Sequence, residues 1–161
     1  VLFILLIDHW IFQIIFKKYF LLIRMKKVIT FGTFDLFHIG HLKILERAKE
    51  YGDYLIVGIS SDELNWNKKK KYPIFSSKER LEIISALKCV DEVFIEEVID
   101  KEEYCKKYNA DIFIIGDDWK GKVCGKENKT FDEQLEGICS VIYLERTPSI
   151  STTEIIEKIK L

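Results

Sequence analysis

The sequence lacks a strong excess of charge, paired cysteine motifs, internal repeats and low-complexity linkers. Its 25 Lys and Arg residues nearly balance 26 Asp and Glu residues, so the net charge of -1 provides no general attraction to nucleic acid or to anionic membranes. The four cysteines show no C-x-x-C pair and no metal-like spacing, which indicates reduced thiols in a cytoplasmic protein. These thiols are Cys89, Cys105, Cys124 and Cys139.

The sequence also lacks an uninterrupted apolar run long enough for a bilayer span of about 20 residues. Residues 1–24 are mostly apolar, but polar residues interrupt them at Asp8, His9, Gln13, Lys17, Lys18 and Arg24. We expect this extension to lie outside the native domain, as upstream sequence translated ahead of a true start at Met25, the single methionine. A peripheral or membrane-anchoring helix and an added structural helix are the alternatives.

Residues 25–161 have the size of one domain. A chain of 161 residues, of which 48% are hydrophobic, can bury one sizeable core but not two. The pattern predicts strands at 28–31, 54–60, 92–95, 111–115 and 140–144, and helices from residue 40 and at 77–87, 101–108 and 151–159. This alternation predicts a Rossmann-like α/β fold with a parallel sheet, in which ligands bind at the carboxyl ends of the strands.

One segment combines a buried strand, a turn and a helix that begins with histidines. The apolar run at 28–31 stops at Gly32, and helical spacing begins at Gly40. Gly40 lets a ligand approach the backbone, and the helix N-terminus offers unpaired N–H groups to a phosphate. His38 and His41, three residues apart, can donate hydrogen bonds to the same anion. The segment therefore predicts a nucleotide phosphate site; the alternative is one histidine that caps a turn and one on the surface.

Two motifs in the chain resemble the signatures of a known family. Residues 32–41 contain G-T-F-D and H-I-G-H, which resembles the HxGH signature of the nucleotidyltransferase superfamily. Residues 146–153 read R-T-P-S-I-S-T-T, which is similar to the second signature of the cytidylyltransferases, RTxGISTT. The resemblance implies the Rossmann-like three-layer fold of the HxGH nucleotidyltransferases. It also implies a cytoplasmic, homodimeric enzyme that transfers CMP from CTP to a phosphorylated alcohol and releases pyrophosphate.

The resemblance favours glycerol 3-phosphate as the acceptor, with CDP-glycerol for teichoic-acid-like polymers as the product. Three departures leave the acceptor open: Ser149 stands at the usual glycine, Lys88 at an expected arginine, and residues 123–130 form an insertion. Phosphocholine, phosphoethanolamine or another phosphorylated alcohol are alternatives, and so is an adenylyltransferase that uses ATP. No nucleic acid partner is expected, and no membrane association unless residues 1–24 belong to the native protein.

The resemblance further implies roles for individual residues. The expected catalytic residues are His38, His41, Lys68 and Arg80. The expected nucleotide-binding residues come from both motifs and are Gly32, Thr33, Phe34, Asp35, Gly40, Arg146, Thr147, Ile150, Ser151 and Thr152. The residues expected to contact the acceptor substrate are Lys68, Lys70, Asp118 and Trp119.

Several of these residues also have structural interpretations. The lysine run 68–71 lies in a predicted loop, where such a run is often a solvated charge cluster, and Arg80 could form a surface ion pair. Asp117 and Asp118 follow a predicted strand, so they suit Mg²⁺ or substrate hydroxyls, but equally a polar turn with helix-capping aspartates. Mg²⁺ is therefore the expected cofactor, with Asp117 or Asp118 as candidate ligands. Ser151 is also the predicted N-cap of the last helix.

Overall fold

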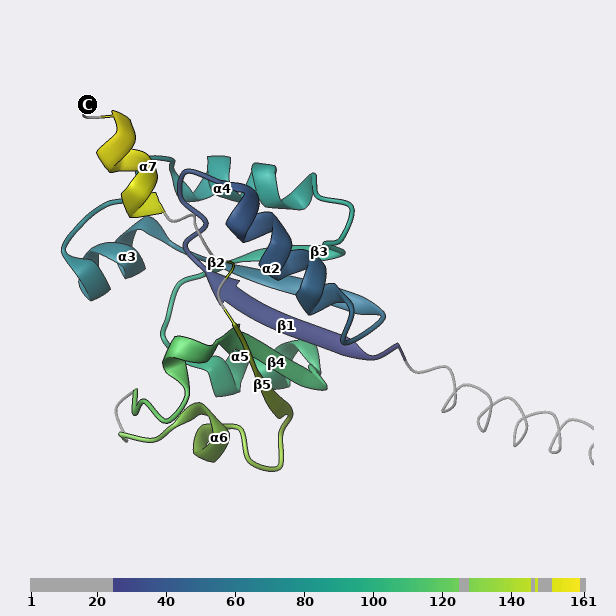
Figure 1. Ribbon diagram of the computed structural model, residues 1–161. Coiled ribbons are helices and arrows are strands. Elements are labelled where there is room, and N and C mark those ends of the chain that lie inside the picture. Colours follow the sequence, from purple (N-terminus) through teal and green to yellow (C-terminus); the bar gives the residue numbers. More distant parts are fainter. Residues whose placement is uncertain (1–24, 125–127, 146, 148–151, 160–161) are drawn as a thin grey trace, which may run out of the picture.

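Parallel strands form the centre of the molecule (Figure 1). The computed structural model describes residues 25–124, 128–145, 147 and 152–159. The sheet contains β1 (Lys27–Gly32), β2 (Tyr54–Ser60), β3 (Glu92–Glu96), β4 (Ile112–Gly116) and β5 (Ser140–Leu144), in the order β3-β2-β1-β4-β5. Each neighbouring pair of strands is parallel. The predicted α/β fold with a parallel sheet is therefore confirmed.

Helices cover both faces of the sheet. One face carries α2 (Ile39–Lys49) and α4 (Ser77–Ser85), and the other carries α5 (Lys101–Tyr108) and α6 (Phe131–Gln134) (Figure 1). Successive residues of β1 belong to different cores: Val28 lies in the core with Leu45 of α2, whereas Ile29 lies in the core with Phe113 and Phe131. The result is the predicted three-layer arrangement, because both faces of a parallel sheet must be buried.

The loop predicted between β2 and α4 contains a helix, α3 (Asp62–Lys69). Ser61 caps its start, since the Leu64 N–H donates to the Ser61 Oγ at 3.0 Å, and Lys70 ends it in the left-handed region at φ 53°. The sequence pattern did not predict this helix because only Leu64 and Asn65 are buried, so it has no apolar stripe. The prediction of a loop at 68–69 is thus corrected.

The other differences are small. The turn η1 (Asp117–Trp119) and helix α6 were not predicted, and α4 ends at Ser85 rather than at residue 87. The last helix, α7 (Thr152–Ile159), is present, but its predicted cap Ser151 lies outside the described residues, as do Arg146, Ile150 and residues 1–24. Within the described ranges, no helix is both long enough and apolar enough to cross a membrane.

Candidate active site

A cavity of about 560 Å³ lies next to the carboxyl ends of β1 and β2. Its wall comes from the turn after β1, the start of α2, the end of α3 with the loop that follows it, and the start of α7. The carboxyl edge of the sheet is where the topology predicts a ligand. Segments more than 100 residues apart in the sequence meet there, since the Thr152 Oγ1 donates to the Asp35 carbonyl at 3.2 Å across 117 residues.

The turn after β1 folds back over its own strand. Phe34 and Leu36 have positive φ values of 53° and 44°, and Phe34 is buried. A Cβ at Gly32 would lie 2.8 Å from the Phe34 ring, so the absence of a side chain there permits the fold-back. Phe34 and Thr33 therefore both reach the cavity wall.

Asp35 connects this turn to the loop after α3. Its carboxylate oxygens accept hydrogen bonds from the Ile74 N–H at 2.9 Å and the Phe75 N–H at 3.0 Å. Thr33 makes a second connection, since its hydroxyl donates to the Asn65 Oδ1 at 2.8 Å. Thr33 and Asp35, both expected to bind nucleotide, thus also hold the opposite wall of the cavity in place.

His38 and His41 lie together at the start of α2. His38 is the N-cap residue, and its Nδ1 accepts a hydrogen bond from the Gly40 N–H at 3.1 Å. The two imidazole rings stack with centroids 3.8 Å apart and an interplanar angle of 21°. The His41 ring also contacts the rings of Phe34 and Phe37, with centroid separations of 5.5 and 5.7 Å. Both histidines line the cavity, as the motif predicts.

The surroundings of these rings favour their neutral form. Burial and, to a smaller extent, the nearby His38 lower the pKa of His41 to about 4, while Asp35 acts in the opposite direction. Burial also lowers the pKa of His38, and Glu154 acts in the opposite direction. Since the His38 Nδ1 accepts a hydrogen bond, the neutral ring carries its proton on Nε2 and can donate it. Among the residues that the structure describes, the buried His41 Nδ1 has no hydrogen-bond partner.

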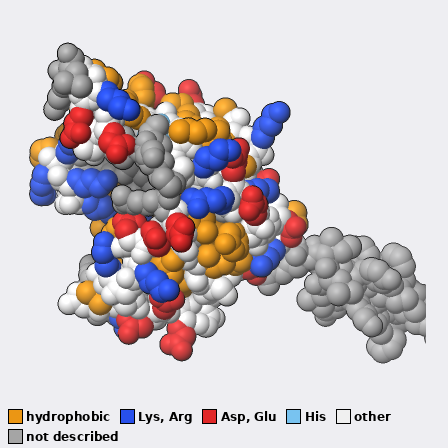
Figure 2. All heavy atoms as spheres, viewed as in Figure 1, with side chains coloured by type: hydrophobic (Ala, Val, Ile, Leu, Met, Phe, Trp, Pro, Cys, Tyr) orange, Lys and Arg blue, Asp and Glu red, His pale blue; other side chains and the backbone are white. Residues whose placement is uncertain are grey.

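The lysines of the cavity wall are Lys69 and Lys71. The expected substrate contacts, Lys68 and Lys70, are not in the cavity wall, and their contact with substrate stays a prediction. Lys68 extends toward the buried Glu96, with its Nζ 4.0 Å from Oε1, and Lys70 is the left-handed residue that ends α3. Figure 2 shows Lys and Arg side chains gathered on the side of the molecule where α3 lies in Figure 1.

Arg80 lies inside the protein rather than in the cavity wall. Its side chain is 0% exposed, and its guanidinium donates to the carbonyls of Phe75 and Thr33, at 2.9 and 2.6 Å, and to the Asp62 Oδ1 at 2.7 Å. These bonds give Arg80 a connecting role, and its expected catalytic role stays a prediction. The guanidinium forms its ion pair with Asp62 and joins three segments that surround the cavity.

The carboxylates at the end of β4 lie apart from the cavity wall. Asp117, Asp118 and Trp119 form η1 directly after Gly116, where the Asp118 Oδ1 packs so closely that a Cβ on Gly116 would lie 2.5 Å from it. The Trp119 ring contacts the Phe131 ring at 5.8 Å. Among the residues that the structure describes, no three His, Cys, Asp or Glu side chains form a group that could hold a metal ion.

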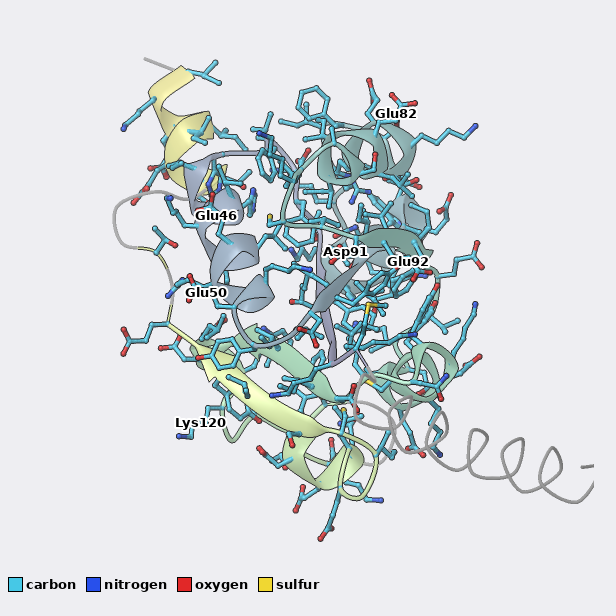
Figure 3. All side chains as sticks on the ribbon, turned by 90° about the vertical axis from the view of Figure 1, so that its right-hand side faces the viewer. Glu46, Glu50, Glu82, Asp91, Glu92 and Lys120 are labelled. Atoms are coloured by element: carbon cyan, nitrogen blue, oxygen red, sulfur yellow. The ribbon has the colours of Figure 1, made fainter. Side chains whose placement is uncertain are left out.

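Four acidic residues lie near the amino ends of the strands, at the end of the sheet opposite the cavity. Figure 3 shows Glu46 and Glu50 on α2, and Asp91 and Glu92 at the start of β3. The C-terminal half of α2 and the start of β3 are both near the amino ends of the strands, and none of these four residues lines the cavity. Two of these carboxylates form ion pairs with lysines of α2, Glu46 with Lys43 and Asp91 with Lys49.

Sequence reasoning missed three residues that build this site. Asn65 is buried, lines the cavity, and donates through its amide to the carbonyls of Ser60 and Ser61, at 3.1 and 2.9 Å. Tyr72 lines the cavity beside Lys71. Arg47 donates to the Glu145 carbonyl at 2.7 Å and to the Thr147 Oγ1 at 3.5 Å, and so holds the start of the second motif. No sequence signal distinguished these residues, and Asn65 and Arg47 act through contacts with distant segments.

A parallel α/β sheet with two histidines at a helix N-terminus and lysines around one cavity defines the class, a Rossmann-like nucleotidyltransferase domain. A family model described as cytidylyltransferase-like matches residues 29–158. The chain belongs to the cytidylyltransferase-like family.

Individual relatives agree with this assignment. A glycerol-3-phosphate cytidylyltransferase from Bacillus spizizenii is 52% identical over 132 residues, which cover 81% of this chain and 95% of that protein. The protein of the same name from Bacillus subtilis is 49% identical over 136 residues, 84% of this chain and 98% of that one. A solved structure, described as a lipopolysaccharide core biosynthesis protein from Thermoplasma volcanium, has a TM-score of 0.64 and 28% identity, covering 79% of this chain and 100% of that one.

Proposed function

We propose that the protein transfers CMP from CTP to glycerol 3-phosphate, giving CDP-glycerol and pyrophosphate. The observation that carries this proposal is the pair of stacked histidines at the N-terminus of α2, in one cavity with Lys69 and Lys71. The two Bacillus relatives, which this chain covers almost entirely, carry the name of this activity.

The chemistry requires positioning more than proton transfer. The phosphate monoester of the acceptor is already an anionic nucleophile, so its oxygen attacks the α-phosphorus of CTP without a general base. A P–O bond to the acceptor forms as the bond to pyrophosphate breaks, and the pyrophosphate leaves with the electron pair. The protein must hold two anions that repel each other and stabilise the charge that develops during their reaction.

The residues of the cavity can supply each part of this task. The positive end of the α2 helix dipole and the Nε2 donor of His38 can face the α-phosphate, with His41 stacked beside His38. Lys69 and Lys71 bring positive charge to the triphosphate from the opposite wall. Thr147 and Thr152 are bonded to α2 and to the turn after β1, which supports a role for them in binding the nucleoside portion. Arg146, Ile150 and Ser151 of the same motif belong to this part of the proposal.

Mg²⁺ is part of this proposal, and when bound it would neutralise charge on the triphosphate. Mg²⁺ is usually held by one or two carboxylates together with phosphate oxygens and water. Asp117 or Asp118 would supply such a carboxylate, and Asp118 and Trp119 would lie toward the acceptor. The cytoplasmic location, the homodimer and the use of CDP-glycerol for teichoic-acid-like polymers belong to the same proposal.

The test is pyrophosphate release from the purified protein with Mg²⁺. CTP and ATP are each combined with glycerol 3-phosphate, phosphocholine and phosphoethanolamine. We expect turnover with CTP and glycerol 3-phosphate. Turnover with CTP and a different acceptor would contradict the acceptor assignment and direct attention to the insertion at 123–130. Turnover only with ATP would contradict the nucleotide assignment.

A further inference from the structure

A buried carboxylate lies at the carboxyl edge of the sheet without a part in the chemistry described above. Glu96 is the last residue of β3, is 0% exposed, and pairs in register with Ser60, the last residue of β2. The Glu96 Oε2 accepts a hydrogen bond from the Ser60 hydroxyl at 2.8 Å. The Glu96 Oε1 forms an ion pair with Lys101, the first residue of α5.

This ion pair is costly to bury. Lys101 is also buried, its Nζ lies 3.7 Å from the centroid of the Phe31 ring, and burial lowers its pKa to about 8. Removing two charges from water costs free energy that their mutual attraction recovers only in part, so a buried ion pair is a weak source of stability. Glu96 lies at the end of β3, one strand away from the cavity. From there it can position a neighbouring side chain.

That neighbour is Lys68, in the last turn of α3. The Lys68 Nζ lies 4.0 Å from the same Glu96 Oε1, and its side chain is 30% exposed. Burial lowers the pKa of Lys68, while Glu96 opposes that shift. Two ammonium groups thus converge on one carboxylate oxygen, and one of them extends from the helix that carries a cavity lysine.

The direction of Lys68 bears on the direction of Lys69. Successive residues on a helix point about 100° apart, so with Lys68 turned toward the buried carboxylate, Lys69 can face the cavity. Lys70 then reverses the chain at φ 53°, and Lys71 returns to the cavity wall.

The outer side of this turn has a second attachment. The Trp66 and Tyr72 rings stack at 4.9 Å with an interplanar angle of 17°, but both side chains are exposed, at 41% and 56%. The exposed stack joins α3 only to the loop that follows it. The contact between Lys68 and Glu96 attaches the end of α3 to the sheet.

We propose that Glu96 is a positioning residue for nucleotide binding: through Lys68 it holds the last turn of α3 against the sheet, so that Lys69 and Lys71 face the phosphates of the nucleotide. The inference rests on the proposed function, because it assigns the phosphates of CTP to this cavity. It assigns Lys68 the attachment to Glu96.

The test compares Glu96→Gln, Lys68→Met and the double variant by steady-state pyrophosphate release and by calorimetric titration with CTP and Mg²⁺. We expect each single substitution to raise the KM and Kd for CTP about tenfold, because two lysine side chains then have to be ordered on binding. We expect kcat to change by less than about threefold, and the double variant to be no weaker than the worse single variant, since both remove one attachment. Lys106→Met is the control, because Lys106 pairs with Glu102 on the surface of α5 and should leave the KM for CTP unchanged.

Three results would overturn the inference. If Lys68→Met raises the KM but Glu96→Gln leaves it unchanged, Lys68 contacts the nucleotide itself. If neither variant changes the KM or the Kd, the attachment has no role in binding. If the variants lower kcat while the Kd is kept, Lys68 acts in the chemical step.

Lys68→Met keeps the buried Glu96 and Lys101 pair, so it tests the inference even where Glu96→Gln does not fold. In that case Lys68→Met is combined with Lys69→Met. We expect Lys69→Met to raise the Kd for CTP by a smaller factor in the Lys68→Met protein than in the wild type. The same factor in both proteins would contradict the attachment. Failure of the proposed function is seen separately, in the wild type. A wild-type protein that binds CTP but does not turn it over contradicts only the proposed reaction, whereas one that binds no CTP overturns both.

Discussion

The neutral state of His41 makes a quantitative prediction about stability and pH. In the unfolded chain His41 takes up a proton near its ordinary pKa of 6.5, whereas in the folded protein burial lowers that pKa to about 4. Above pH 6.5 neither state binds the proton, so His41 has no effect on the free energy of unfolding there. Between pH 6.5 and pH 4 only the unfolded state binds it, so stability falls as the pH falls through this window.

The size of the loss follows from the two pKa values. Each pH unit between them is worth about 1.4 kcal/mol, which gives an upper bound of about 3 kcal/mol at the acid end of the window. Because the His41 ring is only half-buried, solvent screening reduces the expected loss to about 1–2 kcal/mol. His38 contributes in the same direction, since its pKa is also lowered by burial.

The assay is urea denaturation of the wild type and of His41→Asn between about pH 5 and pH 8. Asparagine keeps a polar side chain at the site but does not titrate, so other titrating groups cancel in the difference between the two proteins. We expect the stability of the wild type relative to the variant to decrease as the pH falls below 6.5. Parallel curves for the two proteins would refute the reasoning, because they would mean that His41 has the same pKa in the folded and unfolded states.

Three further predictions concern other parts of the site. His38→Ala and His41→Ala should each lower kcat about 100-fold or more but weaken CTP binding less than about tenfold, because their donors act mainly on charge that develops in the transition state; equal losses in kcat and Kd would contradict this. Arg80→Met should lower the free energy of unfolding by about 3 kcal/mol or more, since it leaves acceptors around a 0% exposed guanidinium unpaired; an unchanged urea midpoint would contradict the buried network. Gly32→Ala should displace the Phe34 ring, 2.8 Å from the new Cβ, and cost about 1–3 kcal/mol in stability, and a variant with the wild-type midpoint and KM for CTP would show that the turn tolerates a side chain.

Much of the fold could be predicted from local sequence patterns. The short β-branched run of β1, the glycine that ends it and the helical spacing after Gly40 all depend on residues close together in the chain. The same is true of the alternation of strands and helices, which leads to a parallel sheet with helices on both faces. Helix α3 was missed because Ser61 is its only strong local signal and just two of its residues are buried.

Local sequence patterns also predicted only part of the cavity wall. His38 and His41 both line the cavity wall, because a helix start positions residues three apart on one side. Lys69 and Lys71 line it rather than Lys68 and Lys70, since the end of α3 determines which lysine turns toward Glu96 and which toward the cavity. The catalytic and substrate-binding roles of these residues stay predictions. Whether Asp118 and Trp119 contact the acceptor stays a prediction.

By itself, the sequence determined the class of fold, the strand, turn and helix that carry the histidines, and the resemblance to the cytidylyltransferases, because these depend on short-range periodicity and on motifs of adjacent residues. Only the tertiary structure decided that Arg80 is buried between Thr33, Phe75 and Asp62, and that Glu96 receives both Lys101 and Lys68. These contacts join segments that are far apart along the chain. Whether a charged side chain faces solvent, substrate or a buried partner depends on which distant segments the fold brings beside it, and that information is not carried by its neighbours in the sequence.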